Sequence, residues 1–264
     1  MDRVRSADGT SIAFDRSGEG PALVLVGGAL SERSAAANLA GRLAPRFTVF
    51  AYDRRGRGDS GDTTPYAPER EVEDLEALIS GVGGSAFVFG HSSGAALALM
   101  AARTPRDSIS KLALYEPPFI VDDSRAPLPD DYVTALDALV SAGRRGDAVE
   151  YFMTAGVGVP EEAIAQMRDD PSWGGLEALA HTLAYDGRIV DGAMAGRPLP
   201  AEWATSVTVP TLVMDGGNSP PWQRRSVEAL ADLIPDAQRL TLEGQDHGAA
   251  PEVLAPVLES FFLG

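Results

Sequence analysis

The side chain best suited to nucleophilic chemistry is Ser92, within Gly90-His91-Ser92-Ser93-Gly94. The apolar run before it, residues 85–89, predicts a short buried strand, and the alanine- and leucine-rich run 95–102 predicts a helix. A G-x-S-x-G pattern between a strand and a helix is typical of a nucleophile elbow. The turn is so sharp that the serine must adopt a strained backbone conformation, and the two glycines remove the Cβ atoms that would block it.

An imidazole that could accept the serine proton lies far along the chain, at His247. It follows residues 237–242, which we expect to form a strand, and stands in Gln245-Asp246-His247-Gly248. A serine early in the chain and a histidine after the last strand fit the order serine, acid, histidine. We therefore expect Ser92 to be the nucleophile and His247 its general base.

The elements around these two residues alternate between strands and helices, which predicts an α/β protein with a mostly parallel sheet. The turn signal at 8–10 predicts a hairpin between residues 3–5 and 11–14. Helices are expected at 31–43, with Ser31 as N-cap, and at 69–79. Strands other than those already mentioned are expected at 22–26, 47–52, 111–115 and 211–214.

The alternation stops between residues 117 and 206, where we find helical patterns and no convincing strand. This break predicts a helical insertion over the ends of the strands. Its expected helices cover residues 130–142, 147–155, 160–168 and 175–185.

The whole chain resembles the α/β-hydrolase superfamily, in its serine-nucleophile branch. The resemblance rests on the elbow, on residues 245–248, on the loop 52–61 and on the segment 210–220. It implies an eight-stranded, mostly parallel sheet flanked by helices, with a helical cap inserted after strand 6. The core would comprise residues 1–116 and 207–264, and the cap residues 117–206.

The resemblance also implies an oxyanion hole. One donor would be the backbone N–H of Ser93, the residue after the nucleophile. The second would be the N–H of Ala29, in the loop after the strand at 22–26, where Gly28 allows the backbone to come close.

The acid that should orient His247 is not at the position where similar enzymes often carry it. Similar enzymes often place an aspartate where this chain has Ser219, and a serine cannot carry the charge that stabilises an imidazolium. Two carboxylates could replace it, Glu116 after the strand at 111–115 and Asp215 at the end of the strand at 211–214. By analogy with relatives that carry their acid after the sixth strand we expect Glu116, with Asp215 as the alternative. His91 and His181 are expected to be structural.

Composition narrows the classes of function. The chain of 264 residues has a formal net charge of −16, which disfavours binding to nucleic acid or to an anionic membrane surface. It has no cysteine, its three histidines are not at metal-ligand spacing, and no apolar run is long enough to cross a bilayer. The G-x-G-x-x-G string at 56–61 is followed by turn residues and not by a helix, so we expect no nucleotide cofactor, no metal and no other cofactor. No secretory signal is visible, which makes a cytoplasmic protein the default.

These observations together predict a serine hydrolase for a small or medium, largely apolar ester, lactone or related acyl compound. Carbon–carbon bond hydrolysis stays open, as does a ligand receptor or a biosynthetic cyclase on the same fold. We also leave a homodimer open. Many large apolar residues of the expected cap should hold it together, and a subset of them should line an apolar substrate pocket. They are Phe119, Ile120, Tyr132, Phe152, Met153, Met167, Trp173, Leu183, Tyr185 and Trp203.

Overall fold

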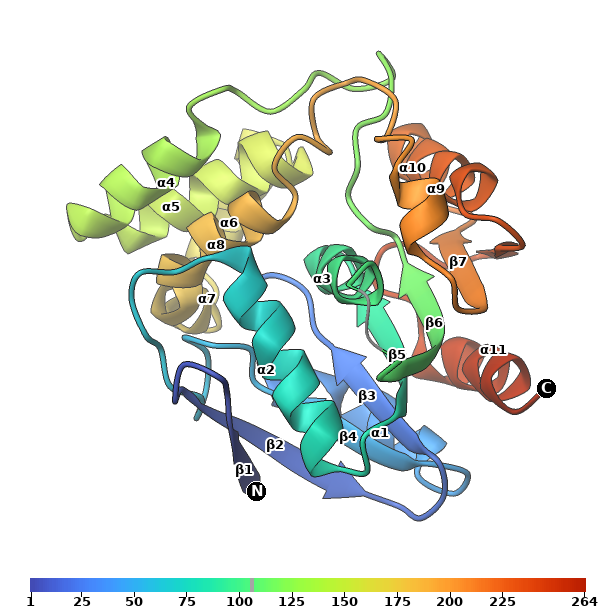
Figure 1. Cartoon of the computed structure of the whole chain (residues 1–264). Coiled ribbons are helices and arrows are strands. Elements are labelled where there is room, and N and C mark those ends of the chain that lie inside the picture. Colours follow the sequence, from blue (N-terminus) through green and yellow to red (C-terminus); the bar gives the residue numbers. More distant parts are fainter. Residues whose placement is uncertain (105–106) are drawn as a thin grey trace.

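The computed structural model describes residues 1–104 and 107–264, and its centre is one eight-stranded sheet (Figure 1). The strands follow the order β1-β2-β4-β3-β5-β6-β7-β8 across the sheet. The first two pairings, β1 with β2 and β2 with β4, are antiparallel, and all others are parallel. The expected mostly parallel eight-stranded sheet is therefore confirmed. The strands are β1 (Asp2–Arg5), β2 (Ser11–Ser17), β3 (Ala22–Val26), β4 (Thr48–Tyr52), β5 (Ala86–His91), β6 (Ile109–Tyr115), β7 (Thr211–Gly216) and β8 (Gln238–Leu242).

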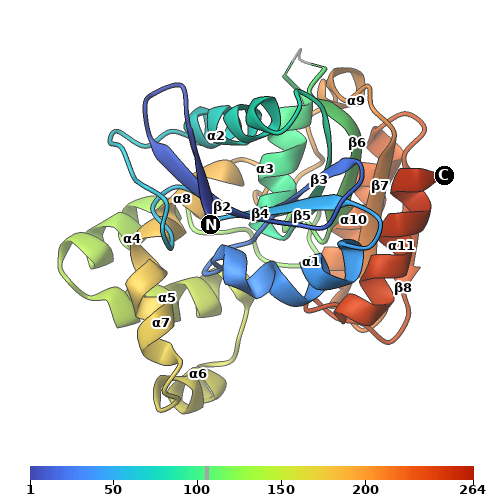
Figure 2. The same ribbon diagram turned by 90° about the horizontal axis from the view of Figure 1, so that it is seen from below.

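Helices cover both faces of this sheet, which explains why its central strands are apolar throughout. Side chains along β3 alternate between the faces, with Leu23 and Leu25 in one core and Val24 and Val26 in the other. The first core is closed by α1 (Ala37–Leu43) and α11 (Pro251–Leu263). The second is closed by α2 (Pro68–Gly81), α3 (Ser93–Ala102) and α10 (Pro221–Leu233). Figure 2 shows α1 and α11 on one side of the sheet, with α2 and α3 on the other.

Between β6 and β7 the described chain forms helices and connecting loops, and no strand is assigned there. This block has an apolar cluster of its own, which includes Tyr132, Leu136, Val149, Trp173 and Leu183. It lies beside the core sheet in Figure 1. Its helices are α4 (Tyr132–Ser141), α5 (Arg145–Tyr151), a π-helical turn Phe152–Val157, α6 (Glu161–Arg168), α7 (Trp173–Leu179), a 3-10 turn Ala180–Thr182, α8 (Leu183–Ile189) and α9 (Trp203–Ser206). The division of the chain at residues 117 and 206 into core and cap stays a prediction.

Three expected helices differ from the structure. The helix expected over 147–155 is α5 followed by the π-helical turn Phe152–Val157. The single helix expected over 175–185 is instead α7, a 3-10 turn and α8. The helix expected at 31–43 is a 3-10 turn, Arg33–Ala36, followed by α1. Ser31 does not cap it, because its hydroxyl donates to the Gly28 carbonyl at 2.7 Å. The described residues contain no helix long and apolar enough to span a membrane.

Candidate active site

Ser92 stands at the junction of β5 and α3 with φ 56° and ψ −126°, a conformation that a non-glycine residue rarely adopts. The adjacent glycines make it possible. A Cβ on Gly94 would lie 2.3 Å from the Val26 carbonyl oxygen, and one on Gly90 would lie 2.6 Å from the Gly94 oxygen. The geometry is that of the sharp strand–helix turn expected from the pentapeptide, and it keeps the backbone close while the serine side chain reaches a cavity.

The parallel register brings a carboxylate to the same edge of the sheet. His91 and Tyr115 are paired across β5 and β6, so the residues after them, Ser92 and Glu116, both follow directly from paired strand ends. Glu116 is fully buried and has φ 47°, which turns its chain away from the strand direction. Its Oε1 accepts the Gly216 N–H at 2.8 Å, and its Oε2 lies 2.7 Å from His247 Nδ1.

The alternative acid lies elsewhere. Asp215 Oδ1 accepts the Thr241 hydroxyl at 2.6 Å, and Oδ2 faces the guanidinium groups of Arg224 and Arg239 at 3.8 and 3.7 Å. Asp215 therefore contacts residues of β8 and α10 and not His247. Asp246, although adjacent to His247, accepts the Gly248 N–H within its own loop.

Glu116 is held in its charged form. Burial alone would raise its pKa, but hydrogen bonding to His247, the nearby Ser219 hydroxyl and the Gly216 N–H outweigh burial, so its pKa is lowered. The Ser219 hydroxyl makes no hydrogen bond of ordinary geometry among the described residues. A second side chain also reaches the imidazole: the Gln223 amide lies 2.8 Å from His247 Nδ1.

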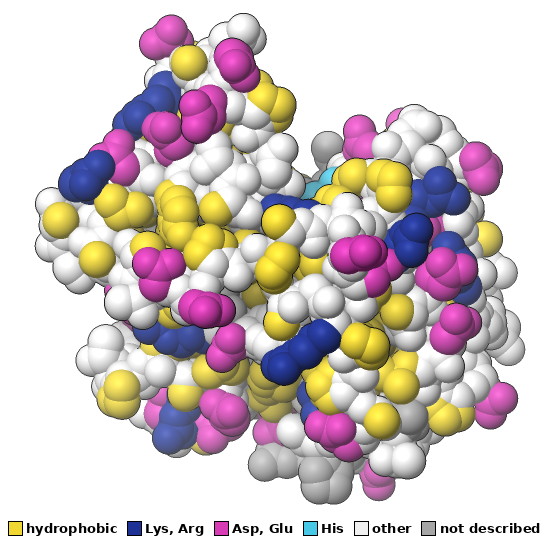
Figure 3. Space-filling model, turned by 90° about the horizontal axis from the view of Figure 1, so that it is seen from above, with side chains coloured by type: hydrophobic (Ala, Val, Ile, Leu, Met, Phe, Trp, Pro, Cys, Tyr) yellow, Lys and Arg dark blue, Asp and Glu magenta, His cyan; other side chains and the backbone are white. Residues whose placement is uncertain are grey.

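Ser92 and His247 line one cavity of about 490 Å³. No hydrogen bond joins these two side chains in the described part of the chain. The other walls are mostly apolar and come from the loops of the sheet, from α10 and from the helical block. A hollow with a histidine at its edge and apolar side chains around it is visible in Figure 3. The apolar lining includes Pro118, Leu128, Tyr132, Phe152, Val157, Val159, Val190, Met194 and Trp222.

The two expected oxyanion donors border the same cavity, since Ala29 and Ser93 both line it. Gly28 lets this loop approach the elbow, because a Cβ there would lie 3.0 Å from Ser92 Cβ. Its carbonyl oxygen accepts from Arg57 at 2.5 Å and from Ser31 at 2.7 Å. Ser93 is the first residue of α3, so its N–H has no acceptor within the helix.

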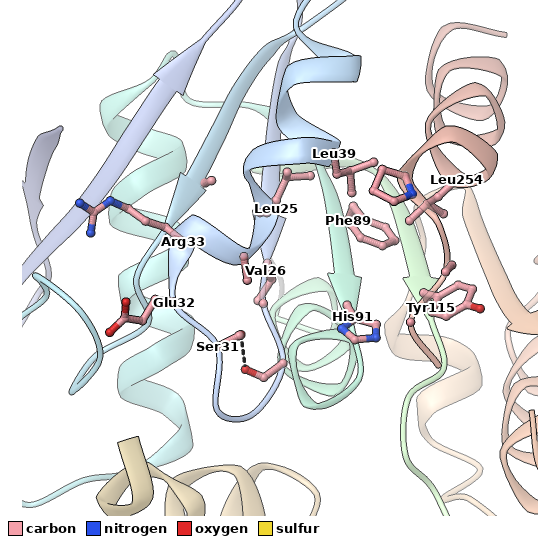
Figure 4. A pocket seen from close by; sticks show the side chains of 18 of the residues that line it. Leu25, Val26, Ser31, Glu32, Arg33, Leu39, Phe89, His91, Tyr115 and Leu254 are labelled. Atoms are coloured by element: carbon pink, nitrogen blue, oxygen red, sulfur yellow. Dashed lines mark hydrogen bonds between the residues drawn. The ribbon is translucent and has the colours of Figure 1, made fainter. Parts of the chain in front are cut away.

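His91 lies on the other side of His247, in a second cavity of about 180 Å³ shown in Figure 4. Its Nε2–H donates to the His247 carbonyl at 2.8 Å, since a carbonyl can only accept. Burial, and then the proximity of His247, lower the pKa of His91 to about 4. The figure shows its ring at the end of β5, near Phe89 and Tyr115. This position agrees with the structural role expected for it.

Sequence reasoning missed a buried ionic cluster beneath the cavity. Asp186 in α8 pairs with Arg54 and Arg57, each at 2.7 Å, and also lines the cavity. The available signal was the run of arginines at 54, 55 and 57 directly after a buried strand, where unpaired charges would be costly. Of the large cap residues, a subset of which was expected to line a pocket, Tyr132 and Phe152 line this cavity, and Trp173 and Leu183 belong to the apolar cluster of the helical block.

The other two features singled out from the sequence are the G-x-G-x-x-G loop and His181, and both make structural contacts. The loop 56–61 does not open a helix, since α2 begins only at Pro68. His181 Nε2 lies 2.8 Å from the Gly56 carbonyl, which docks the helical block on this loop. No cluster of His, Cys, Asp or Glu suited to a metal ion occurs among the described residues.

Comparisons with known proteins identify the family of the fold. The model of the alpha/beta hydrolase family matches residues 23–257. A crystal structure of an alpha/beta hydrolase from Sphaerobacter thermophilus is 59% identical, with a TM-score of 0.92, and the match covers 99% of this chain and 100% of that one. The 2-(acetamidomethylene)succinate hydrolase of Mesorhizobium japonicum is 28% identical over 261 residues, 92% of this chain and 88% of the relative. The N-formylmaleamate deformylase of Pseudomonas putida is 26% identical over 236 residues, 87% of this chain and 83% of the relative.

Proposed function

Because the chain belongs to the alpha/beta hydrolase family and is a hydrolase of that fold, we propose that it cleaves a small or medium, largely apolar ester, lactone or related acyl compound by serine catalysis. The observation that carries this proposal is the hydrogen bond between Glu116 and His247 beside a cavity that Ser92 also lines. In this proposal the three side chains supply the nucleophile, the base and the acid that acyl transfer requires.

In the proposed reaction, Ser92 Oγ attacks the acyl carbon while His247 Nε2 takes its proton. The ionised Glu116 stabilises the imidazolium through Nδ1–H. The N–H groups of Ala29 and Ser93 donate to the oxyanion, and each such donor is typically worth about 2.7–4 kcal/mol of barrier. His247 then protonates the leaving alkoxide, and an activated water molecule hydrolyses the acyl-enzyme.

The cavity supports an uncharged substrate. Its charged lining residues are Asp186 and Asp246, and no lysine or arginine is among the described residues that line it. The names of the two curated relatives denote substrates with carboxylate groups. A carboxylate in this cavity would meet no lysine or arginine among the lining residues, although the Arg125 guanidinium lies 4.6 Å from the ring of the lining residue Trp222 and donates to the Ala155 and Gly156 carbonyls. We therefore propose that this chain differs from those relatives in substrate charge.

A fluorophosphonate probe tests the proposal directly. Rapid covalent labelling of Ser92, found by peptide mass, with loss of labelling in His247→Ala, would support a working nucleophile. A protein that neither takes the label nor hydrolyses p-nitrophenyl esters of any chain length would instead favour the receptor or cyclase alternative.

A further inference from the structure

We propose that Asp186, from the helical block, is a positioning residue that holds both oxyanion donors in place. The proposal rests on the proposed function, because it assigns a role in the same site. Among the described residues, no hydrogen bond joins Asp186 to Ser92 or to His247. The Asp186 carboxylate instead reaches the two backbone segments that carry the donors.

The first connection runs to the segment after the nucleophile. Ser93 Oγ donates to Asp186 Oδ1 at 2.7 Å, and Arg54 also donates to that oxygen at 2.7 Å. Arg54 lies 3.3 Å from Ser93 Oγ as well, so the serine side chain is held from two sides. Ser93 begins α3 and lines the cavity, so holding its side chain restricts movement of the peptide whose N–H is the proposed donor.

The second connection runs to the loop after β3. Arg57 donates to Asp186 Oδ2 through one nitrogen and to the Gly28 carbonyl through the other, at 2.7 and 2.5 Å. In a planar trans peptide the N–H points opposite to the carbonyl. Holding the Gly28 carbonyl on Arg57 therefore turns the Ala29 N–H the other way, and Ala29 lines the cavity with Ser92.

The surroundings make this arrangement rigid. Asp186 is 3% exposed, and Arg54 and Arg57 are 2% and 1% exposed, so water competes little for these bonds. Arg54 is also paired in a bidentate manner with Glu71 at 2.7 and 2.8 Å. Burial would raise the pKa of Asp186, but the charges of Arg57 and Arg54 outweigh it and lower this pKa, so the carboxylate stays charged.

One consequence is that the helical block is more than a wall of the cavity. Asp186 lies in α8, whereas the donors lie in the β3 loop and in α3. Correct seating of α8 on the sheet would therefore be required for full transition-state stabilisation, even when the substrate is bound.

The test compares Asp186→Asn with Asp74→Asn. Asp74 is a matched control because it forms a similar buried bidentate pair, with Arg55 at 2.7 Å through both oxygens, but bonds to neither donor segment. For Asp186→Asn we expect kcat on a p-nitrophenyl ester to fall about 10- to 100-fold, somewhat less than the loss of a donor itself. KM should change little. Asp74→Asn should lose comparable stability and keep its kcat.

A transition-state readout separates positioning from a general loss of structure. A boronic acid that forms a tetrahedral adduct on Ser92 should bind Asp186→Asn more weakly, in proportion to kcat/KM. A non-reactive ketone or alcohol of the same size should bind both proteins equally. Ser93→Ala, which removes only one connection, should lower kcat by a smaller factor and be non-additive with Asp186→Asn.

If Asp186→Asn does not fold, Ser93→Ala and Arg57→Met carry the test with the same readouts. Unchanged kcat and boronate affinity in variants that remove these connections would overturn the proposal, as would an equal loss in Asp74→Asn. A wild-type protein that is neither labelled at Ser92 nor active on esters would overturn the proposed function, and this inference with it. Active wild type with unaffected variants would overturn this inference alone.

Discussion

Glu116 Oε2 and His247 Nδ1 lie 2.7 Å apart, although 131 positions separate the two residues. The contact exists because β6 ends beside β7 and the histidine loop folds back over both strand ends. It places a buried carboxylate on His247 Nδ1. The other ring nitrogen, Nε2, is the one proposed to take the proton of Ser92.

Glu116→Gln should lower kcat by about 10³–10⁴-fold, because a neutral amide neither stabilises the imidazolium nor fixes its tautomer. The variant keeps the size of the side chain and can still accept the Gly216 N–H, so the fold should persist. Hydrolysis of one activated ester and a thermal unfolding curve would measure both effects.

Asp215→Asn is the control for that prediction. Asp215 is buried and bonded to Thr241, so some stability should be lost, while kcat should stay within a few-fold of the wild type. The reverse ranking of the two variants would make Asp215 the acid and contradict the assignment of Glu116.

Gly94, two residues after the nucleophile, allows a second comparison between a variant and its control. Gly94→Ala would bring Cβ within 2.3 Å of the Val26 oxygen and 2.5 Å of the Gly27 oxygen, both backbone atoms that cannot move freely. We expect a loss of about 1–3 kcal/mol in unfolding free energy from such overpacking, together with loss of activity.

Gly41→Ala is the matched control, because Gly41 lies in α1 with no atom within 4 Å of the position of its Cβ. It should be neutral or stabilise the protein by about 0.5–1 kcal/mol. Chemical denaturation of both variants checks the pair. Equal stability in Gly94→Ala and Gly41→Ala would show that the elbow backbone is not constrained as described.

The sequence was most informative where local pattern and tertiary position agree. Apolar runs such as residues 22–26 predict buried strands, because parallel strands covered on both faces need apolar side chains throughout. The glycines around Ser92 likewise predict the elbow, because the turn leaves no space for a Cβ. Such features leave a signal in residues that are close together in the sequence, even where the atoms that exclude a Cβ, such as the Val26 oxygen at Gly94, come from another strand.

Features that depend on distant residues could not be predicted in this way. Ser31 has the chemistry of an N-cap, yet its hydroxyl bonds to Gly28, which only the folded loop brings near. The link from Asp186 to Arg57 spans 129 positions, and no periodicity encodes it. Where the helix expected over 175–185 is interrupted, His181 contacts the Gly56 carbonyl, a contact between the helical block and the sheet loops.

His91 should make stability fall as the solution becomes acidic. Its pKa is about 4 in the folded protein and about 6.5 when unfolded, so between these values the unfolded chain binds more protons. Stability should therefore decrease as pH falls from about 6.5 to 4, by at most about 1.4 kcal/mol per pH unit from this residue.

His91→Gln isolates that contribution, since the amide can still donate to the His247 carbonyl but does not titrate. The difference in unfolding free energy between wild type and variant, measured by urea denaturation, should shrink as pH falls through this window. A difference that stays constant from pH 7 to pH 4 would show that His91 is not held neutral.

The rate of hydrolysis should depend on the charge of the acyl group. p-Nitrophenyl butyrate and p-nitrophenyl hemisuccinate share one reacting ester, but the second ends in a carboxylate. Because the charged residues lining the cavity are aspartates in the described chain, kcat/KM should be about 10- to 100-fold lower for the hemisuccinate.

Val157 is 42% exposed and lines the same cavity, so it can accept a charged side chain. Val157→Lys should recover part of the lost rate on the hemisuccinate, whereas Val157→Gln, of similar length, should not. Equal rates of the wild type on both esters would contradict the proposed preference for an uncharged acyl group.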